Sequence, residues 1–500
     1  MTPEASATGP SIRLPATLAI GFTGHRALKD EAMCRKSILD FLAKRKESTP
    51  GMVYGVASVA AGGDLLFAES CIQLAVPLCV LLPLPVEQFR KDFDEVTWSR
   101  AEQVLKKAAS VEVTGGNQSR EECYYECGIE TVQRSRLLLA LWDGNSSHGL
   151  GGTEDVVTFA RGISKPVVWL HSVTGDIQVF NEKTEKELLD DAELYFLNSL
   201  PDVHATVDTS KPEDLVRTWF RKVDDSATRF APQVRRLAAI PIVCTAAAAL
   251  FTGAGSWAHT LGTWLAIGSV LGIMAAVLPA ILRLYQRQIS WARARTAAEV
   301  CRSVLAFWNT PTPYEAIGPE VVPELSGVLM SLDFLKMLDR ERSEASLEEF
   351  KRRYRQERVS GQIAYFLDHA AQSAAEAHRY RVTIWACVGL AAVADLWLFV
   401  TSNAVGRFDP GPWRSWLALG ASIAFQVATV AGALLAVNDC DRRRQRYREL
   451  YQQLGKWDAQ LEALRTWPSV LRVAGRIERA LLAELIEWRS LIRNQKLAQQ

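Results

Sequence analysis

Residues 237–282 read LAAIPIVCTAAAALFTGAGSWAHTLGTWLAIGSVLGIMAAVLPAIL and contain no Lys, Arg, Asp or Glu. One helical crossing of a bilayer needs about 20 apolar residues, so this stretch is long enough for two crossings. Its middle, residues 253–262, contains Gly, Ser and His, which suits a turn. The stretch therefore predicts a transmembrane hairpin with crossings at residues 237–258 and 262–282.

A second apolar block, residues 382–438, is interrupted at 407–414, where prolines and a glycine suit a short turn. It predicts a second hairpin, with crossings at 382–403 and 415–438. Arginines flank the outer ends of both hairpins, for example Arg236 and Arg283. Because Lys and Arg are enriched in cytoplasmic loops, we expect four crossings with the N-terminus, the segment between the hairpins and the C-terminus all cytoplasmic.

The composition limits the classes of partner. The net charge of +1 gives no support for nucleic-acid binding, since the basic clusters sit beside the predicted crossings. The nine cysteines are scattered, as is typical of reduced cytosolic proteins. Cys123 and Cys127 lack the further ligands that a metal site would need, so we expect no metal. Residues 1–15 lack the pattern of a signal peptide.

Before the first hairpin, apolar runs alternate with helical patterns. The runs are residues 14–22, 52–59, 78–83, 137–142 and 166–170. Each is continuous rather than alternating, which is typical of a parallel sheet covered on both faces. The sequence therefore predicts an α/β Rossmann-like, doubly wound fold over residues 11–173, within a first domain of residues 1–175. A linker and coupling helix at 176–232 and an all-α membrane domain at 233–500 complete the predicted organisation.

Three loops carry glycines where the predicted strands end: residues 21–26, 60–64 and 143–155. In a doubly wound sheet, ligands bind beyond the carboxyl ends of the strands. Glycines let the backbone approach a ligand, and helix N-termini favour phosphate, so we expect a nucleotide or a derivative. The candidate binding residues are Thr23, Gly24, His25, Arg26, Gly62, Gly63, Asp64, Asp143, Gly151, Gly152, Thr153, Glu154 and Asp155. The alternative is that Asp64 and Thr153 only cap their helices.

Four motifs in this order, residues 20–26, 55–64, Arg134 followed by 138–143, and 151–155, resemble the SLOG superfamily of DprA-like and LOG-like proteins over residues 17–171. The resemblance implies a Rossmannoid fold and adds Arg134 to the candidate binding residues. LOG enzymes cleave the glycosidic bond of a nucleoside monophosphate and carry Pro-Gly-Gly-x-Gly-Thr-x-Glu-Glu. Here Asp155 and Val156 replace the two Glu, so we expect no enzyme activity.

Non-catalytic SLOG domains resemble sensors of nucleotide second messengers in bacterial antiphage systems. That resemblance implies a ligand such as a cyclic nucleotide or an NAD or ADP-ribose derivative, supplied by a partner synthase, with no other cofactor. Residues 358–366 and 477–488 are similar to SLATT-type effector domains, proposed membrane-perturbing partners of such systems. This second resemblance covers residues 350–492 and implies a homo-oligomer in the lipid bilayer of a bacterial inner membrane. SLATT domains have two crossings, whereas four are predicted here.

Asp395 is the one ionisable residue inside the third predicted crossing. A carboxylate in lipid costs on the order of 3 kcal/mol, so such a residue normally faces a cavity, a partner or another helix. Asp395 is therefore a candidate pore residue, and the alternative is a carboxyl that hydrogen-bonds neighbouring helices. We expect a messenger-gated membrane effector of abortive infection. A membrane-tethered nucleotide N-glycosidase and a non-gated membrane scaffold are the alternatives.

Overall fold

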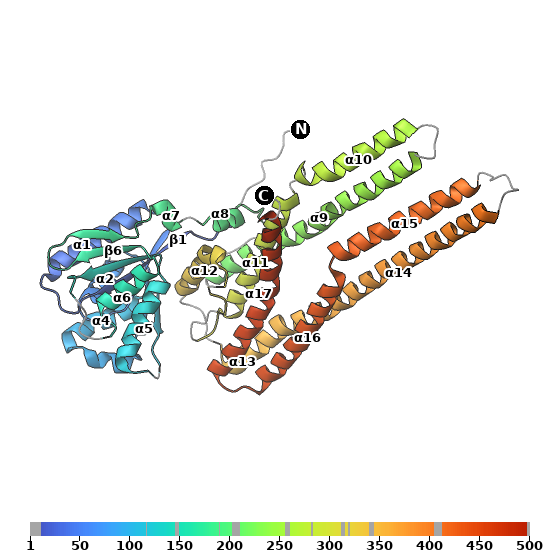
Figure 1. Ribbon diagram of the computed structural model, residues 1–500. Coiled ribbons are helices and arrows are strands. Elements are labelled where there is room, and N and C mark those ends of the chain that lie inside the picture. The colour runs from blue at the N-terminus through green and yellow to red at the C-terminus, as the bar shows by residue number, and fades with distance from the viewer. Residues whose placement is uncertain are drawn as a thin grey trace, which may run out of the picture. The chain divides into compact units, whose positions relative to one another are not determined.

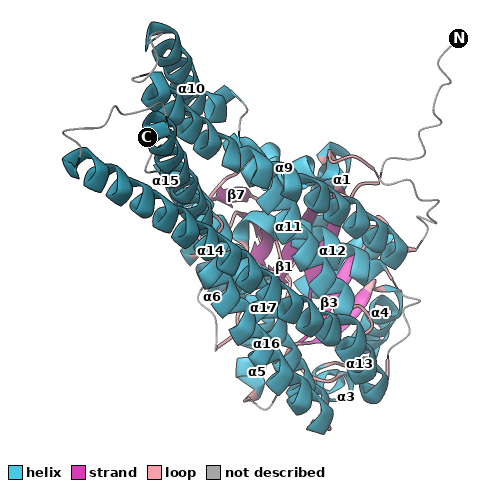
Figure 2. Cartoon of the chain, turned by 90° about the vertical axis from the view of Figure 1, so that its right-hand side faces the viewer, coloured by secondary structure: helices cyan, strands magenta, loops and turns pink. Residues whose placement is uncertain are grey.

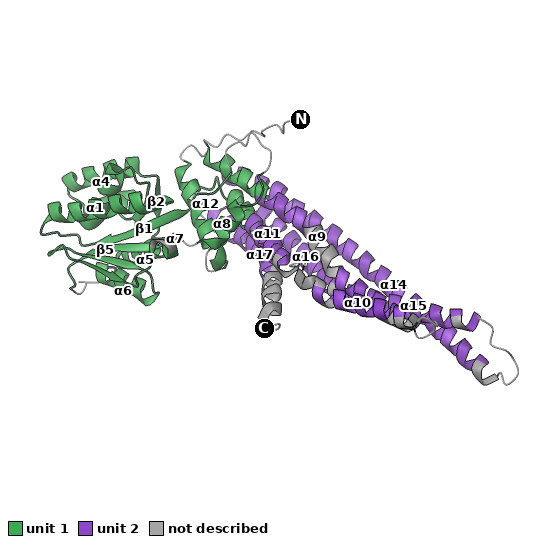
Figure 3. Ribbon diagram, turned by 90° about the horizontal axis from the view of Figure 1, so that it is seen from above, with its two compact units in different colours: residues 1–222, 300–345 green, residues 223–299, 346–500 purple. Residues whose placement is uncertain are grey.

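The computed structural model describes residues 12–116, 118–145, 150–189, 191–202, 211–255, 261–281, 284–311, 316–318, 321–339, 345–404 and 413–497 (Figure 1). The middles of both predicted hairpin turns, at 256–260 and 405–412, lie outside these residues. The chain divides into two compact units, coloured separately in Figure 3. Unit 1 is Met1–Lys222 with Val300–Ala345, and unit 2 is Val223–Glu299 with Ser346–Gln500. Residues 300–345 thus belong with the N-terminal unit, which the sequence patterns did not indicate.

Unit 1 contains one seven-stranded sheet in the order β4-β3-β2-β1-β5-β6-β7 (Figure 2). The strands are β1 (Thr17–Gly24), β2 (Met52–Ala57), β3 (Leu78–Leu82), β4 (Ser110–Val113), β5 (Leu137–Trp142), β6 (Val167–His171) and β7 (Ile177–Phe180). The first six pair in parallel, which confirms the predicted α/β domain. β7 pairs with β6 in antiparallel fashion, so the expectation of a purely parallel sheet was wrong. β7 returns beside β6 through a tight turn at Gly175, whose φ is +78°.

Helices cover both faces of the sheet. α1 (Glu31–Ser48), α2 (Gly63–Gln73) and α4 (Glu95–Lys107) share the larger apolar core with strands that include β1 and β3. α5 (Arg120–Gln133) and α6 (Thr153–Gly162) share a second core with β5 and β6. Side chains set the starts of several helices, since Asp30, Asp94 and Ser119 accept hydrogen bonds from first-turn amides. The remaining elements of unit 1 include α7 (Glu185–Leu189), α8 (Ala192–Asn198) and α12 (Ser326–Leu338).

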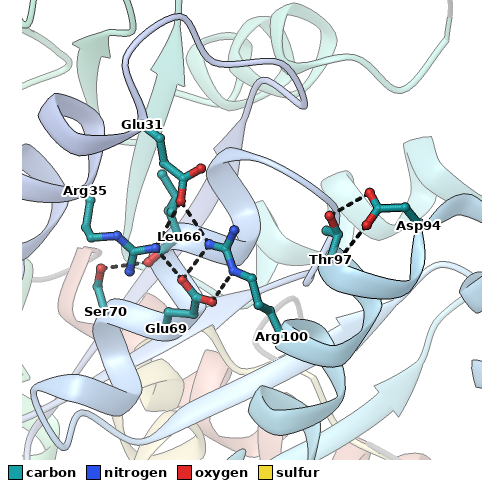
Figure 4. A network of polar contacts seen from close by, with 8 residues as sticks. All are labelled: Glu31, Arg35, Leu66, Glu69, Ser70, Asp94, Thr97 and Arg100. Carbon is teal, nitrogen blue, oxygen red and sulfur yellow. Dashed lines mark hydrogen bonds and ion pairs between the residues drawn. The ribbon is translucent and has the colours of Figure 1, made fainter.

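One ion cluster joins α1, α2 and α4 (Figure 4). Arg100 donates to Glu69 through Nε and Nη2, at 2.8 and 2.9 Å, and Arg35 donates to Glu69 Oε2 at 2.6 Å. Glu31 accepts from both arginines. Burial alone would raise the pKa of Glu69, but the bonds from Arg100 and Arg35 outweigh it and hold that pKa below its ordinary value. The cluster therefore ties three helices together through one ionised carboxylate.

Unit 2 is helical throughout its described residues. Its helices are α9 (Pro212–Gly255), α10 (Leu261–Ile281), α11 (Leu284–Ala306), α13 (Leu347–Arg353), the π-helical segment η3 (Tyr354–Ser360), α14 (Gly361–Ala404), α15 (Trp413–Val437), α16 (Cys440–Ala463) and α17 (Trp467–Leu497). The first residues of α9 and the last residues of α11 belong to unit 1. The sequence Ser346-Leu-Glu-Glu349 has the form of a capping box, and Ser346 caps α13 by accepting from the Glu349 amide. Ser210, followed by Pro212 and Glu213, has the sequence pattern of a helix cap before α9, and it lies outside the described residues.

Two stretches of unit 2, Leu347–Thr401 and Trp416–Ala463, contain helices long and apolar enough to cross a membrane. In the first predicted hairpin, the described apolar helices are shorter, Ile240–Phe251 and Ala266–Ala275. The structure thus confirms a helical C-terminal region with two long apolar helices. Four crossings stay a prediction.

Replacing Glu69 with Gln should destabilise unit 1 by about 1–2 kcal/mol at pH 7, because two arginines lose a charged acceptor. A lowered pKa means that the carboxylate stabilises the fold above its unfolded pKa and loses this effect as the pH falls. Thermal unfolding of the full-length protein at pH 7 and pH 4 measures both effects, and the difference between Glu69→Gln and the parent should shrink at pH 4. Glu95→Gln is the control, since Glu95 is 87% exposed and pairs only with Arg90 among the described residues. Equal destabilisation by the two variants would contradict the argument.

Candidate ligand-binding site at the strand switch point

The strand order reverses between β1 and β5. From β1 the chain proceeds to β2, β3 and β4 on one side, and β5, β6 and β7 lie on the other. Loops that follow β1 and β5 therefore leave the sheet in different directions, which opens the crevice where doubly wound sheets bind ligands. His25 directly follows β1 and Asp143 directly follows β5. The topology thus brings two predicted binding residues, 118 positions apart, to one point.

His25 and Asp143 are in direct contact. His25 Nε2 lies 2.8 Å from Asp143 Oδ1, and the His25 amide donates to the Leu141 carbonyl at 3.1 Å. The Asn145 backbone and side-chain amides also donate to Asp143, both at 3.0 Å. Burial would raise the pKa of Asp143, but the hydrogen bonds from Asn145 and His25 hold it well below its usual range. Asp143 is therefore an ionised acceptor that organises the loop after β5.

Glycines allow the loops after β1 and β2 to touch. Gly62 has a φ of +89°, and a Cβ there would lie 2.4 Å from the His25 carbonyl oxygen. The Gly63 amide donates to that same oxygen at 2.8 Å. A Cβ on Gly24 would lie 3.1 Å from Gly63 Cα. No larger residue fits at Gly62 without moving the backbone, so the small residues of both motifs serve this close approach. Thr23 lies inside the β1–β5 ladder, opposite Ala140.

Asp64 has an unused polar atom. It is the second residue of α2, and its Oδ1 is shielded from solvent and accepts no hydrogen bond from the described residues. Burial raises its pKa to about 7, while Arg26 and the Gly24 amide lower it. The N-cap of α2 is Gly62, so no N-cap side chain accepts from the first turn of this helix. A carboxyl with a free oxygen, beside the loop of Arg26, is therefore present where a ligand is expected.

Arg26 is exposed and lies against α5. Its guanidinium carbon is 4.7 Å from the centre of the Tyr124 ring, a cation–π distance. The Tyr124 hydroxyl donates to Asp92, which also accepts from Arg120. Burial raises the pKa of Tyr124 beyond its usual range, so its hydroxyl stays protonated. Neither Tyr124 nor Asp92 was among the predicted binding residues, because no local pattern in the sequence links either residue to Arg26.

The backbone amides of Gly151 and Gly152, in the loop before α6, already donate to a side chain of that helix. Asp155 Oδ2 accepts from the amides of Gly151, at 2.9 Å, and Gly152, at 3.2 Å. Gly151 has a φ of +88°, and a Cβ there would lie 2.8 Å from the Tyr125 amide nitrogen. Thr153 is buried at the start of α6, and Glu154 follows it. In this structure the helix is thus capped by Asp155 rather than by Thr153, and an anion would have to displace that carboxylate to reach these amides.

Arg134 lies apart from the other candidates. It ends α5 and precedes β5, which places it at the amino ends of the strands, opposite the loops described above. Its guanidinium donates to Glu112 of β4 and to Glu130 of α5. These partners give Arg134 a role in holding α5 against the edge of the sheet.

The described residues contain no group of three or more His, Cys, Asp or Glu side chains that could hold a metal ion. Cys127 is buried, and its thiol donates to the Leu81 carbonyl at 3.4 Å. Cys123 is buried beside Gly115. Both cysteines therefore pack between α5 and the strand edge.

No protein-family model and no curated protein matches this chain.

Replacing Asp64 with Asn should make stability less dependent on pH. Its pKa rises from 3.8 to about 7 on folding, so the folded state binds the extra proton and loses relative stability as the pH rises through that range. Asp64→Asn should be more stable than the parent by about 1–3 kcal/mol at pH 8, where the parent buries the Asp64 carboxylate, and this advantage should shrink as the pH falls toward 5.

Thermal unfolding across pH 5–8 measures this difference, with Asp143→Asn as the matched control. Asp143 has a lowered pKa, so its replacement should destabilise the protein at pH 8 instead. If Asp64→Asn is as unstable as Asp143→Asn at pH 8, Asp64 has a partner in solution and its carboxyl is not free for a ligand.

Proposed function

We propose that this protein is a membrane effector of antiphage defence. Its α/β unit binds a nucleotide-derived second messenger, and its helical unit then opens or disrupts the bacterial inner membrane. The observation that carries the proposal is the convergence of His25, Asp143 and Asp64 at the strand switch point, in a chain that also has two long apolar helices.

The side chains at the switch point suit the parts of a nucleotide. Arg26 is an exposed cation beside the N-terminus of α2, and together they favour phosphate. The unpaired oxygen of Asp64 suits a ribose hydroxyl or a base amino group. A cyclic nucleotide or an NAD or ADP-ribose derivative offers both kinds of group. A partner synthase would supply this messenger.

Val156 supports binding rather than catalysis. It is buried in the apolar core between α5 and α6, and its Cγ2 lies 2.5 Å from where a Cβ on Gly128 would be. A carboxylate at this position would face apolar side chains instead of the crevice. The resemblance to LOG enzymes requires a second Glu there, so the proposal includes no enzyme activity.

A nucleotide N-glycosidase is the second candidate, and one observation favours it. The pKa of Asp64 is about 7, which suits a general acid or base at neutral pH. Incubating the purified protein with AMP and measuring free adenine by chromatography separates the two functions. Release that Asp64→Asn abolishes would establish the glycosidase.

The exposed apolar surface of α14 and α15 supports a membrane location. The two helices pack through Ala391, Ala394 and Ala421, and large side chains point away from this seam. Trp385 is 74% exposed and Leu390 68% exposed. Apolar surface this extensive is unstable in water and suits lipid. In the proposed topology, the apolar parts of α9 and α10 form a first hairpin, and both termini are cytoplasmic.

Asp395 supports assembly in the membrane. It is exposed on α14, beside the seam with α15, and no described residue pairs with it. If several copies surrounded an ion path, the Asp395 carboxyl of each copy would face that path. The carboxyl would then avoid contact with lipid. We therefore propose a homo-oligomer whose pore is lined in part by Asp395. A non-gated scaffold is the remaining alternative, and it requires no ligand response.

Replacing Arg26 with Ala should weaken ligand binding about tenfold or more, because one charged hydrogen bond is worth about 1.5–3 kcal/mol. Isothermal calorimetry with cyclic dinucleotides, NAD and ADP-ribose would identify a ligand and then compare variants. Lys29→Ala is the matched control, since Lys29 is an exposed cation in the same loop. Unchanged affinity in both Arg26→Ala and Gly152→Val would show that the ligand binds elsewhere.

Replacing Asp395 with Asn should reduce messenger-triggered depolarisation of cells, since it removes the one charge in the predicted crossings and nearly preserves shape. Membrane insertion and ligand binding should persist. Asp368→Asn is the control on the same helix, because Asp368 precedes the apolar segment and bonds Gln372. If Asp395→Asn depolarises cells like the parent while Asp395→Leu destabilises the protein, the carboxyl is a structural hydrogen-bonding group.

A further inference from the structure

A charged cluster is buried at the base of α14. Arg358 donates to Glu478 through Nε, at 2.9 Å, and through Nη2, at 2.6 Å, and Nη2 also donates to Glu299. The three side chains, here called the Arg358 cluster, are 4%, 0% and 5% exposed in the order Arg358, Glu478, Glu299. Burial disfavours the charge on Arg358, yet the two carboxylates raise its pKa well above the ordinary value. The cluster is therefore charged, and it joins η3, α17 and α11.

Neighbouring polar side chains attach the same segment to unit 2. The Tyr354 hydroxyl donates to Glu478 Oε1 at 2.8 Å. The Lys351 ammonium donates to the Leu464 carbonyl at 2.8 Å, in the turn between α16 and α17. Arg355 forms two hydrogen bonds to Asp458 of α16, at 2.8 and 3.0 Å. Contacts from residues 351–358 thus fix the chain immediately before α14 begins.

This fixed chain is a π-helix rather than an α-helix. In η3 each hydrogen bond spans five residues instead of four, a rare geometry that occurs frequently at functional sites. A π-turn takes up about one residue more than an α-turn, so tightening η3 to α-geometry would turn the following helix forward by about 100°. Arg358 lies within η3, and its Nη1 is buried without a hydrogen-bond partner among the described residues. Arg358 thus forms hydrogen bonds through Nε and Nη2 but not through Nη1.

We propose that η3 is a π-to-α switch that rotates α14, and that the Arg358 cluster holds it in the π state. This inference uses residues of unit 2 alone and does not depend on the proposed ligand. Forward rotation by one residue position would place Leu390 and Val393 where Ala391 and Ala394 now meet α15. Small residues permit close helix packing, so these larger side chains would push α15 away. Opening the cluster would therefore separate the apolar hairpin.

Cysteine pairs can report the register of α14 in the full-length protein in nanodiscs, with Cys387 and Cys440 replaced by Ser. In the parent, Ala394→Cys with Ala421→Cys should form a disulfide faster than Val393→Cys with Ala421→Cys. Glu478→Gln removes one charge from the cluster, and the ratio of the two rates should fall by about tenfold or more. Hydrogen exchange of the amides in η3 should accelerate by a similar factor.

Asp441→Asn is the matched control, because it removes the partner of Arg381 on α14, outside η3, and leaves the contacts of residues 351–358 intact. It should change neither the rate ratio nor exchange in η3. If Glu478→Gln loses the circular dichroism signal of its helices, Tyr354→Phe is the deciding variant. It deletes the hydroxyl that donates to Glu478 and should shift the ratio in the same direction. An unchanged ratio and unchanged exchange in the folded cluster variant would overturn the switch, as would an equal response in Asp441→Asn.

Discussion

β1 is the strand on which the candidate site depends, because it is hydrogen-bonded along both edges. Its first part, Thr17–Gly21, pairs with β2, and its last part, Ile20–Gly24, pairs with β5. This stagger brings the end of β1 alongside the end of β5 and leads His25 to Asp143. Gly21 is needed for the arrangement, since a Cβ there would lie 2.6 Å from Ser135 Oγ. Strand pairing and close packing at Gly21 thus determine where the crevice lies, independently of any ligand.

The sequence indicated the central strands correctly and missed the outer ones for a physical reason. Strands buried on both faces read as continuous apolar runs, as in β5. β4 instead alternates, with Glu112 facing Arg134 and its two valines exposed, and it is only four residues long. β7 is an exposed antiparallel edge. Because β4 was not predicted, its Glu112 was not recognised as the partner of Arg134. Arg134 therefore remained among the candidate ligand-binding residues.

The candidate site was predictable as a location but not as a set of contacts. Parallel strands end at one edge, so glycine-bearing loops after β1, β2 and β5 had to meet there. The spacing of residues in the sequence could not show that Asp155 accepts hydrogen bonds from the amides of Gly151 and Gly152. Nor could it show that one oxygen of Asp64 has no hydrogen-bond partner among the described residues. Tyr124 reaches Arg26 from a helix nearly a hundred residues along the chain. Such contacts depend on packing between elements, which local patterns do not record.

Two helices carry the chain between the units, and each has a buried charge at the point where it crosses. In α9, Lys222 is fully buried and donates to the carbonyls of Ile12, at 2.9 Å, and Asn198, at 2.8 Å. In α11, Glu299 meets Arg358. Each charge is paired within its own unit, and leaving either charge buried without these partners would be costly. These buried pairs therefore fix Lys222 in unit 1 and Glu299, the last residue of unit 2 on α11, in unit 2.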